Sequence, residues 1–331
     1  MNAVDGGAVT ASASVSVPAV VEVEGLRVTI SPRGGRPVAP VQDVDLRIRR
    51  GEVVGLVGES GSGKTMLARA VAGLLAPGLR PRVEGRIHVL DRELGSASAA
   101  ERRATLRTDL SYVFQDPNAH LNPTTRIGDQ VAEVAVPNGN RVEDLFRSVG
   151  LPTTEEFARR YPHQLSGGMK QRVVIACALA KDPGVIIADE PTTALDVTIQ
   201  AQVLRLLRDL ATTREVGILL VSHDLAAIGQ FCDSVAVMYA GRIVEEGPTS
   251  AILRTPRHPY TKALMGALFD IHTPEHRPVA IPGSVPALDD PPDGCRFGPR
   301  CGYRTEHCDD EPELIDVGPG RRSRCWNWER L

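Results

Sequence analysis

The chain has 331 residues, 42% of them hydrophobic and 24% charged, which is ordinary for a globular protein with one large domain and a smaller appendage. Its formal charge of −3 and pI near 6.3 give no basic surface for nucleic acid and no polybasic membrane anchor. No window holds the roughly 18 uninterrupted apolar residues that a membrane-spanning helix requires. Binding to DNA or RNA is therefore disfavoured, and any action at a membrane is expected to depend on partners.

The N-terminal run Met1–Val20 is rich in Ala, Ser, Val and Gly. It contains Asp5, lacks a basic start and has no continuous apolar centre, so it does not fit a secretory signal peptide. We expect residues 1–19 to form a disordered tail in the cytosol.

The next segments predict two strands, then a strand, a loop and a helix. Val21–Val28 and Val44–Ile48 are alternating or β-branched, as strands are. Glu52–Val57 is a short apolar run that predicts a buried strand, and Lys64–Leu75 has helical periodicity. Strand, loop and helix are the context that a phosphate-binding loop requires.

A helical segment then interrupts the strands. From Glu101 to about Arg160 the pattern is polar and helical, apart from a strand predicted at Leu110–Phe114. We expect a helical subdomain at about residues 101–180. Its inward positions are expected to be Leu106, Val131, Val134, Leu145 and Phe146.

Strands and helices alternate in the second half of the chain. The expected elements are a helix to Ala180, a strand at Val185–Ala188, a helix at Ile199–Leu210, a strand at Gly217–Val221 and a last pair around Ser234–Val244. This alternation predicts an α/β fold with a mainly parallel, covered sheet over residues 20–250. Beyond Pro248 regular periodicity fades. We expect a short helix from His258 and a turn-rich linker at Pro282–Pro292 within an appendage of residues 251–331.

The first chemical motif is Gly58-Glu59-Ser60-Gly61-Ser62-Gly63-Lys64-Thr65. A glycine-rich loop between strand and helix turns backbone N–H groups toward phosphate oxygens, and the helix dipole favours the same anions. Lys64 would reach the β and γ phosphates of ATP, and Thr65 would bind Mg²⁺. Taken alone, the motif could still be an ordinary glycine turn before a helix.

Two acidic residues follow the predicted strand Val185–Ala188. Asp189 is placed to hold Mg²⁺ through water, and Glu190 is placed to act as general base for the attacking water. Two acids at this position can also be a solvated strand end. The phosphate loop upstream favours the catalytic interpretation.

Two further polar residues follow predicted strands. Gln115 follows the strand at Leu110–Phe114 and could contact Mg²⁺ and the attacking water. His223 lies just past Gly217–Val221 and could hydrogen-bond the γ-phosphate. Either residue alone could be an ordinary surface group, and their order in the chain supports the catalytic roles.

The second motif is Leu165-Ser166-Gly167-Gly168-Met169-Lys170-Gln171, which predicts a helix start. Ser166 would be the N-cap, and the glycines permit close backbone approach. A helix start is an anion site, and the chain has no second phosphate loop to supply its ligand. The expected ligand is ATP bound to another cassette, and a simple helix cap is the alternative.

In this order, the two motifs, Gln115, Asp189-Glu190, Ala194-Leu195-Asp196 and His223 closely resemble the ATPase subunits of ATP-binding-cassette (ABC) transporters. The resemblance covers about residues 20–250 and implies an N-terminal antiparallel β-subdomain besides the helical one. It also implies a head-to-tail dimer. Ser166, Gly167, Gly168 and Gln171 of one subunit would face ATP on the other, with Asp196 at the seam. The family usually stacks an aromatic residue on adenine, where this chain has Ile30.

Three segments resemble the ATPases of dipeptide, oligopeptide and nickel importers: Phe114–Pro123, Arg257–Leu264 and Gly294–Cys301. The resemblance implies a paralogous ATPase subunit, two membrane permeases and an extracytoplasmic substrate-binding protein as partners. It places the chain peripherally on the cytoplasmic face of the membrane. Peptides are the expected cargo, with nickel or another small solute as the alternative. Soluble cassette ATPases of ribosomes or DNA usually have two cassettes or a long coiled coil, and the sequence has neither.

Six cysteines in a cytosolic protein argue against disulfides. Cys295, Cys301, Cys308 and Cys325 crowd into an irregular segment that a bound metal would hold together. Zinc-type Cys-x2-Cys pairs are absent, and some members of the resembled branch carry a [4Fe–4S] cluster here. We expect such a cluster, with zinc or unligated thiols as alternatives. Cys177 and Cys232 are expected to be inert packing residues, and His258 a packing or capping residue.

Overall fold

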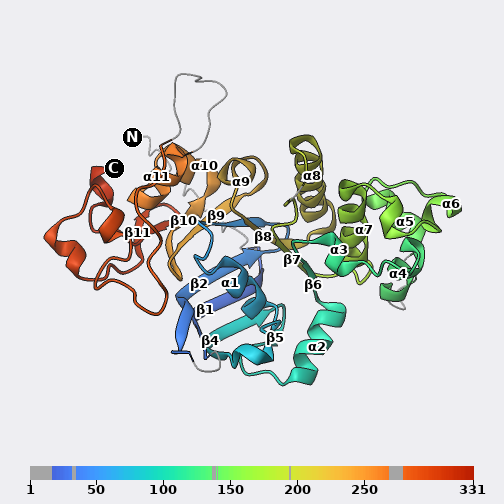
Figure 1. Ribbon diagram of the computed structural model, residues 1–331, viewed down its shortest axis with the longest axis horizontal. Helices are drawn as coiled ribbons and strands as arrows, with labels where there is room; N and C mark the ends of the chain where they lie inside the picture. Colours follow the sequence, from blue (N-terminus) through green and yellow to red (C-terminus); the bar gives the residue numbers. More distant parts are fainter. Residues whose placement is uncertain (1–16, 32–34, 136–138, 140, 194, 268–278) are drawn as a thin grey trace, which may run out of the picture.

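The computed structural model describes residues 17–31, 35–135, 139, 141–193, 195–267 and 279–331. Its centre is an eight-stranded sheet with the order β11-β12-β10-β9-β3-β8-β7-β6 (Figure 1). The strands are β3 (Val53–Val57), β6 (Leu110–Val113), β7 (Val185–Asp189), β8 (Gly217–Ser222), β9 (Ser234–Tyr239), β10 (Arg242–Pro248), β11 (Ile315–Gly318) and β12 (Arg321–Ser323). The five strands β9, β3, β8, β7 and β6 pair in parallel, which confirms the predicted mainly parallel α/β sheet.

Both faces of this sheet are covered, because successive side chains of a strand point to opposite sides. In β7, Ile186 and Ala188 face one hydrophobic core, whereas Val185 and Ile187 face the other. Helix α1 (Lys64–Val71) packs in the second core. Helices α7 (Gly167–Leu179), α8 (Val197–Arg214) and α9 (Leu225–Phe231) pack in the first.

A separate four-stranded antiparallel sheet covers α1. Its order is β2-β1-β4-β5, with β1 (Ala19–Ile30), β2 (Val38–Arg49), β4 (Arg82–Val89) and β5 (Arg92–Glu93). The predicted antiparallel subdomain is therefore present, and its first two strands are longer than the pattern indicated. The sequence analysis missed β4, because only Ile87 and Val89 of its eight residues are buried.

The helices after the first sheet strands are short. They are α2 (Ala99–Thr108), α3 (Pro117–His120), α4 (Ile127–Val134), α5 (Val142–Ser148) and α6 (Glu155–Ala158). Val131, Leu145 and Phe146 are buried as predicted, whereas Leu106 and Val134 are partly exposed. The predicted helical segment also contains β6, which is the edge strand of the main sheet. Helix α1 ends at Val71, earlier than the predicted Leu75, and Gly73 follows with a positive φ of 68°.

The C-terminal residues continue the main sheet, which the composition did not indicate. After α10 (Thr249–Arg254) and α11 (Pro259–Gly266), the hairpin β11–β12 pairs with β10. The Arg321 guanidinium lies 3.3 Å from the fully buried carboxylate of Glu245 in β10. The sequence analysis predicted the short helix that follows His258 but not this hairpin. Among the described residues, no helix is both long and apolar enough to cross a bilayer.

Candidate functional site

The phosphate loop, Gln115, Asp189, Glu190 and His223 meet at one edge of the main sheet. Parallel strands end on the same side, so the segments that follow β3, β8, β7 and β6 lie next to one another. The phosphate loop follows β3, His223 follows β8, Glu190 follows β7 and Gln115 follows β6 closely. The sheet therefore brings together residues that are far apart in the sequence.

The loop Gly58–Gly63 needs glycine at both of its ends. Gly58 and Gly63 have φ of 154° and 106°, values that side chains rarely permit. A Cβ atom at Gly58 would lie 2.1 Å from the Met238 carbonyl oxygen, and one at Gly63 would lie 2.2 Å from that of Pro40. Ser62 is fully buried, whereas Ser60 and Gly61 are exposed. The loop is thus packed against β2 and β9 while its tip faces solvent.

Lys64 lies under the loop, with only 5% of its surface exposed. Its Nζ donates hydrogen bonds to the carbonyl oxygens of Gly58 at 2.8 Å and Glu59 at 2.9 Å. Burial lowers the pKa of Lys64, while the carboxylates of Glu190, Asp189 and Glu59 oppose this shift. These hydrogen bonds hold the ammonium group of Lys64 next to the loop, where it could form an ion pair with a bound anion.

Asp189 accepts hydrogen bonds on both carboxylate oxygens. The Thr65 hydroxyl donates to Oδ1 at 3.1 Å, and the Tyr112 hydroxyl donates to Oδ2 at 2.8 Å. Burial raises the pKa of Tyr112, so its hydroxyl keeps the proton that it donates. Sequence reasoning missed Tyr112, because a tyrosine in a strand carries no motif. Thr65 and Asp189 offer neighbouring oxygen ligands of the kind that Mg²⁺ prefers.

Glu190 is the meeting point of three side chains. Its Oε2 accepts from Gln115 Nε2 at 3.0 Å and from the Thr193 hydroxyl at 3.1 Å, and it lies 3.3 Å from His223 Nδ1. Glu190 has a φ of 48°, an uncommon value for a residue with a side chain. Its backbone N–H donates to the Val221 carbonyl at 3.0 Å. The strained turn aims the carboxylate away from the sheet edge, toward the residues that follow the neighbouring strands.

The Leu165–Gln171 motif begins helix α7 as predicted. The Ser166 hydroxyl caps the helix by accepting from the Met169 N–H at 3.3 Å. A Cβ atom at Gly168 would lie 2.5 Å from Ile199 Cγ2, so glycine there allows α7 to pack closely on α8. Gly167 is exposed and Gln171 is buried. Helices α7 and α1 pack on opposite faces of the main sheet. The capped start of α7 and helix α1 therefore lie on different sides of the sheet.

Asp196 caps the next helix. Its Oδ1 accepts from the Ile199 N–H at 2.9 Å at the start of α8. Asp196 is exposed, and the neighbouring Val197 side chain is 82% exposed. Ala194 of the same motif lies outside the described residues. Ile30, at the position where the family usually has an aromatic residue, is half-buried at the end of β1.

The four C-terminal cysteines line one small cavity, together with His258 and Phe297. They are Cys295, Cys301, Cys308 and Cys325. Backbone N–H groups point at three of the sulfurs: Tyr303 at Cys301, Thr305 at Cys308 and Asn327 at Cys325, at 3.3–3.5 Å. Burial raises the pKa of Cys295 to about 11 and that of Cys325 to about 12. In the described part of the chain, no group of three or more Cys, His, Asp or Glu is arranged to hold a metal ion. The expected metal site is therefore not confirmed.

The remaining cysteines and His258 have packing roles. Burial raises the pKa of both Cys177 and Cys232 to about 12, so both thiols stay protonated. His258 is buried, and its Nδ1 caps α11 by accepting from the Tyr260 N–H at 3.1 Å. Burial lowers the pKa of His258 to about 3, which keeps the ring neutral.

Two protein-family models match the chain. Residues 41–193 match the model described as ABC transporter, and residues 244–308 match the C-terminal region of oligopeptide/dipeptide transporters. The first match contains the phosphate loop, the α7 helix start and Glu190. The second contains three of the four C-terminal cysteines.

Curated relatives and solved structures are similar over most of the chain. The dipeptide transport ATP-binding protein DppD of Escherichia coli is 42% identical over 87% of this chain and 91% of its own length. The oligopeptide transport ATP-binding protein AppD of Bacillus subtilis is 40% identical over 90% of this chain and 93% of its own. The structure of the ATP-binding cassette MJ0796, a dimer bound to ADP and Pi, superposes with a TM-score of 0.61 at 27% identity. It covers 69% of this chain and 98% of the cassette.

Replacing Tyr112 by Phe tests whether the hydroxyl that sequence reasoning missed matters to the site. The change removes one of the two side-chain donors to Asp189 and leaves the ring in place. We expect the Mg²⁺ concentration for half-maximal ATP hydrolysis to rise about tenfold, since a hydrogen bond to a charged group contributes about 1.5 kcal/mol or more. The control is Tyr303→Phe, whose hydroxyl accepts from Lys262 at the surface. An unchanged Mg²⁺ requirement in Tyr112→Phe would show that Thr65 alone orients Asp189.

Proposed function

Because the chain belongs to the ATP-binding subunits of ABC-type dipeptide and oligopeptide transporters, we propose that it powers the import of dipeptides or oligopeptides. It is an ATP-hydrolysing enzyme. The observation that carries the proposed mechanism is the convergence of Gln115, Thr193 and His223 on the carboxylate of Glu190. A carboxylate held in this way beside a phosphate loop suits a base that takes a proton from an attacking water.

In the proposed mechanism, the loop Gly58–Thr65 holds the phosphates of ATP, with Lys64 on the β and γ phosphates. Thr65, Asp189 and Gln115 would hold Mg²⁺, which supplies charge neutralisation of the phosphates when it is bound. Gln115 donates through its Nε2 to Glu190, so its amide oxygen is the atom left for a cation. Glu190 accepts the proton of the attacking water. His223 fixes the carboxylate and contacts the γ-phosphate.

Replacing Glu190 by Gln tests the role of the base. The amide keeps the size and hydrogen-bonding ability of the side chain but cannot take a proton. We expect MgATP to bind normally and turnover to fall about 100-fold or more, since a general base contributes on this scale. The nucleotide-bound dimer should accumulate, which size-exclusion chromatography with ATP would detect. Normal turnover in Glu190→Gln would remove Glu190 from this role.

The start of helix α7, the second predicted anion site, is the basis for the proposed protein partners. Ser166 and Gly168 begin helix α7 on the face of the sheet opposite α1, so they are proposed to bind ATP held by another cassette. Asp196 and the exposed Val197 would lie at the same interface. We expect this second cassette to be a paralogous ATPase subunit. The assembly would include two transmembrane permeases and an extracytoplasmic binding protein, with the chain on the cytoplasmic face of the membrane.

The cargo is tested in the assembled transporter. ATPase activity of the chain, purified with its permeases and partner ATPase in nanodiscs, is measured with binding protein loaded with short peptides or with nickel chelates. We expect peptides to stimulate hydrolysis, since the dipeptide and oligopeptide relatives match at 40% identity or more. Stimulation by nickel alone would contradict the peptide proposal and leave the ATPase mechanism intact.

We also propose that the four C-terminal cysteines bind a [4Fe–4S] cluster. The proposal is supported by the shared cavity and by the backbone N–H groups that point at Cys301, Cys308 and Cys325. Hydrogen bonds to sulfur of this kind tune iron–sulfur clusters. When bound, the cluster would supply a cross-link between the chain segments that carry these cysteines. The residues that would hold it are Cys295, Cys301, Cys308 and Cys325.

Replacing Cys301 by Ser tests the cluster. We expect anaerobically purified wild-type chain to contain iron and acid-labile sulfide and to absorb visible light, and Cys301→Ser to lose these properties. Cys177→Ser is the control, because that thiol is buried elsewhere. Zinc in place of iron, or no metal in the wild-type chain, would contradict the proposal.

A further inference from the structure

The phosphate loop is held by the C-terminal appendage through Arg300. This residue lies in the short segment between Cys295 and Cys301, and its side chain is only 4% exposed. Its Nη1 and Nη2 donate to the two carboxylate oxygens of Glu59 at 2.7 Å and 3.0 Å. Two parallel hydrogen bonds between a guanidinium and a carboxylate fix position as well as neutralise charge. The partners are 241 residues apart in the sequence.

The rest of the guanidinium is fixed by the appendage. Arg300 Nε donates to the Pro282 carbonyl at 2.8 Å, and Nη2 also reaches that of Ile281 at 3.3 Å. Hydrogen bonding to Glu59 raises the pKa of Arg300, which remains a cation. The hydroxyl of Tyr260, also from the appendage, accepts the backbone N–H of Glu59 at 2.7 Å. Glu59 is therefore held at both its side chain and its backbone.

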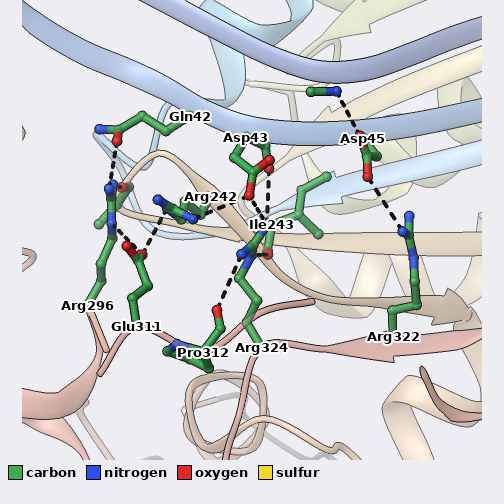
Figure 2. A network of polar contacts seen from close by, with 12 residues as sticks. Gln42, Asp43, Asp45, Arg242, Ile243, Arg296, Glu311, Pro312, Arg322 and Arg324 are labelled. Atoms are coloured by element: carbon green, nitrogen blue, oxygen red, sulfur yellow. Dashed lines mark hydrogen bonds and ion pairs between the residues drawn. The ribbon is translucent and has the colours of Figure 1, made fainter. Parts of the chain in front are cut away.

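A second arginine of the same segment contacts the turn between β9 and β10, and that turn bonds to the phosphate loop. Arg296 donates to the Ala240 carbonyl, and its Nη2 donates to Gln42 Oε1 at 2.8 Å. Figure 2 shows Arg296 between Gln42 and Glu311. Ala240 and Gly241 form the turn between β9 and β10. Gly241 donates its N–H to the carbonyl oxygen of Ser62 in the phosphate loop at 2.8 Å. The turn thereby links Arg296 to the phosphate loop.

We propose that Arg300, together with Tyr260, positions the phosphate loop and neutralises Glu59, so that the C-terminal appendage sets the affinity of the cassette for ATP. Glu59 is a negative charge in a loop whose ligand is a polyanion. Without Arg300 its carboxylate would repel the phosphates at short range, where the partly buried site screens charge weakly. Arg300 and Tyr260 are positioning residues, because they act through Glu59.

Other arginines of the appendage bind the cassette away from the loop, and they provide the control. Arg322 pairs with Glu246 at 2.7 Å. Figure 2 shows that Arg322 also faces Asp45, at 3.6 Å, and that Arg324 pairs with Asp43, at 2.7 Å. These contacts attach the appendage to β2 and β10. If Arg300 served only to attach the appendage, loss of the Arg322 pair would have a similar effect on ATP binding.

The test measures MgATP affinity by calorimetry on the full chain, and KM and kcat in the transporter assembled with the partner ATPase and permeases. We expect Arg300→Gln to raise the Kd for MgATP about tenfold, because it breaks a bidentate, largely buried ion pair. KM should rise with it, while kcat at saturating ATP changes little. Arg322→Gln should bind MgATP as the wild-type chain does.

Rescue by a second substitution separates charge and positioning from simple damage. In a Glu59→Gln background there is no carboxylate left to neutralise, so adding Arg300→Gln should change the Kd by about twofold or less.

Tyr260→Phe keeps the buried ring and removes the acceptor of the Glu59 N–H, and we expect the Kd for MgATP to rise about threefold. Tyr260→Phe provides the test of the proposal if Arg300→Gln fails to fold, which thermal denaturation would reveal. An unchanged Kd in Arg300→Gln would overturn the proposal. A Kd in the double variant as weak as in Arg300→Gln alone would also overturn it.

Discussion

The parallel pairing of β3, β8, β7 and β6 is the constraint on which the site depends. In its register Val57 lies beside Ser222, Val221 beside Asp189, and Ala188 beside Val113. Adjacent strands are about 4.8 Å apart, so the residues that follow the ends of these four strands meet within side-chain reach. The phosphate loop, His223, Glu190 and Gln115 are these residues. A shift of one residue in any pair would turn the strand over and send its chemical group to the other face.

The backbone at Glu190 shows how the fold maintains an unfavourable conformation at the functional edge. A residue with a side chain at φ of 48° is held there by its surroundings, here by the N–H bond to Val221 and by three side chains on the carboxylate. Every residue of β7 and β8 is buried between the two cores, and the packed interior of a protein resists shifts of its strands. The fixed position of β7 and β8 therefore holds Glu190, directly after β7, in its unfavourable backbone conformation.

The C-terminal appendage is attached to the cassette at the main sheet, at β2 and at the phosphate loop. Its β-hairpin extends the main sheet, its arginines reach β2 and β10, and Arg300 and Tyr260 contact the phosphate loop itself. The side chains of Arg300, Arg321 and Arg324 are at most 10% exposed, and burial of this kind weakens the screening of charge by solvent. Cys295 and Cys301, which line the cysteine cavity, are the chain neighbours of Arg296 and Arg300.

The sequence by itself determined the local elements and the motifs. The glycine pattern of the phosphate loop, the Ser166 cap and the acids after β7 are each encoded within a few consecutive residues, so their chemistry could be predicted from the residue types and their spacing. The tertiary structure alone decided the contacts between distant segments. Tyr112 and Asp189 are 77 residues apart, and Arg300 and Glu59 are 241 apart. β4 was missed because most of its eight residues are not buried, and the hairpin β11–β12 was missed because its strands have only four and three residues. Such segments have little hydrophobic pattern, and they become strands only when a neighbour supplies hydrogen bonds.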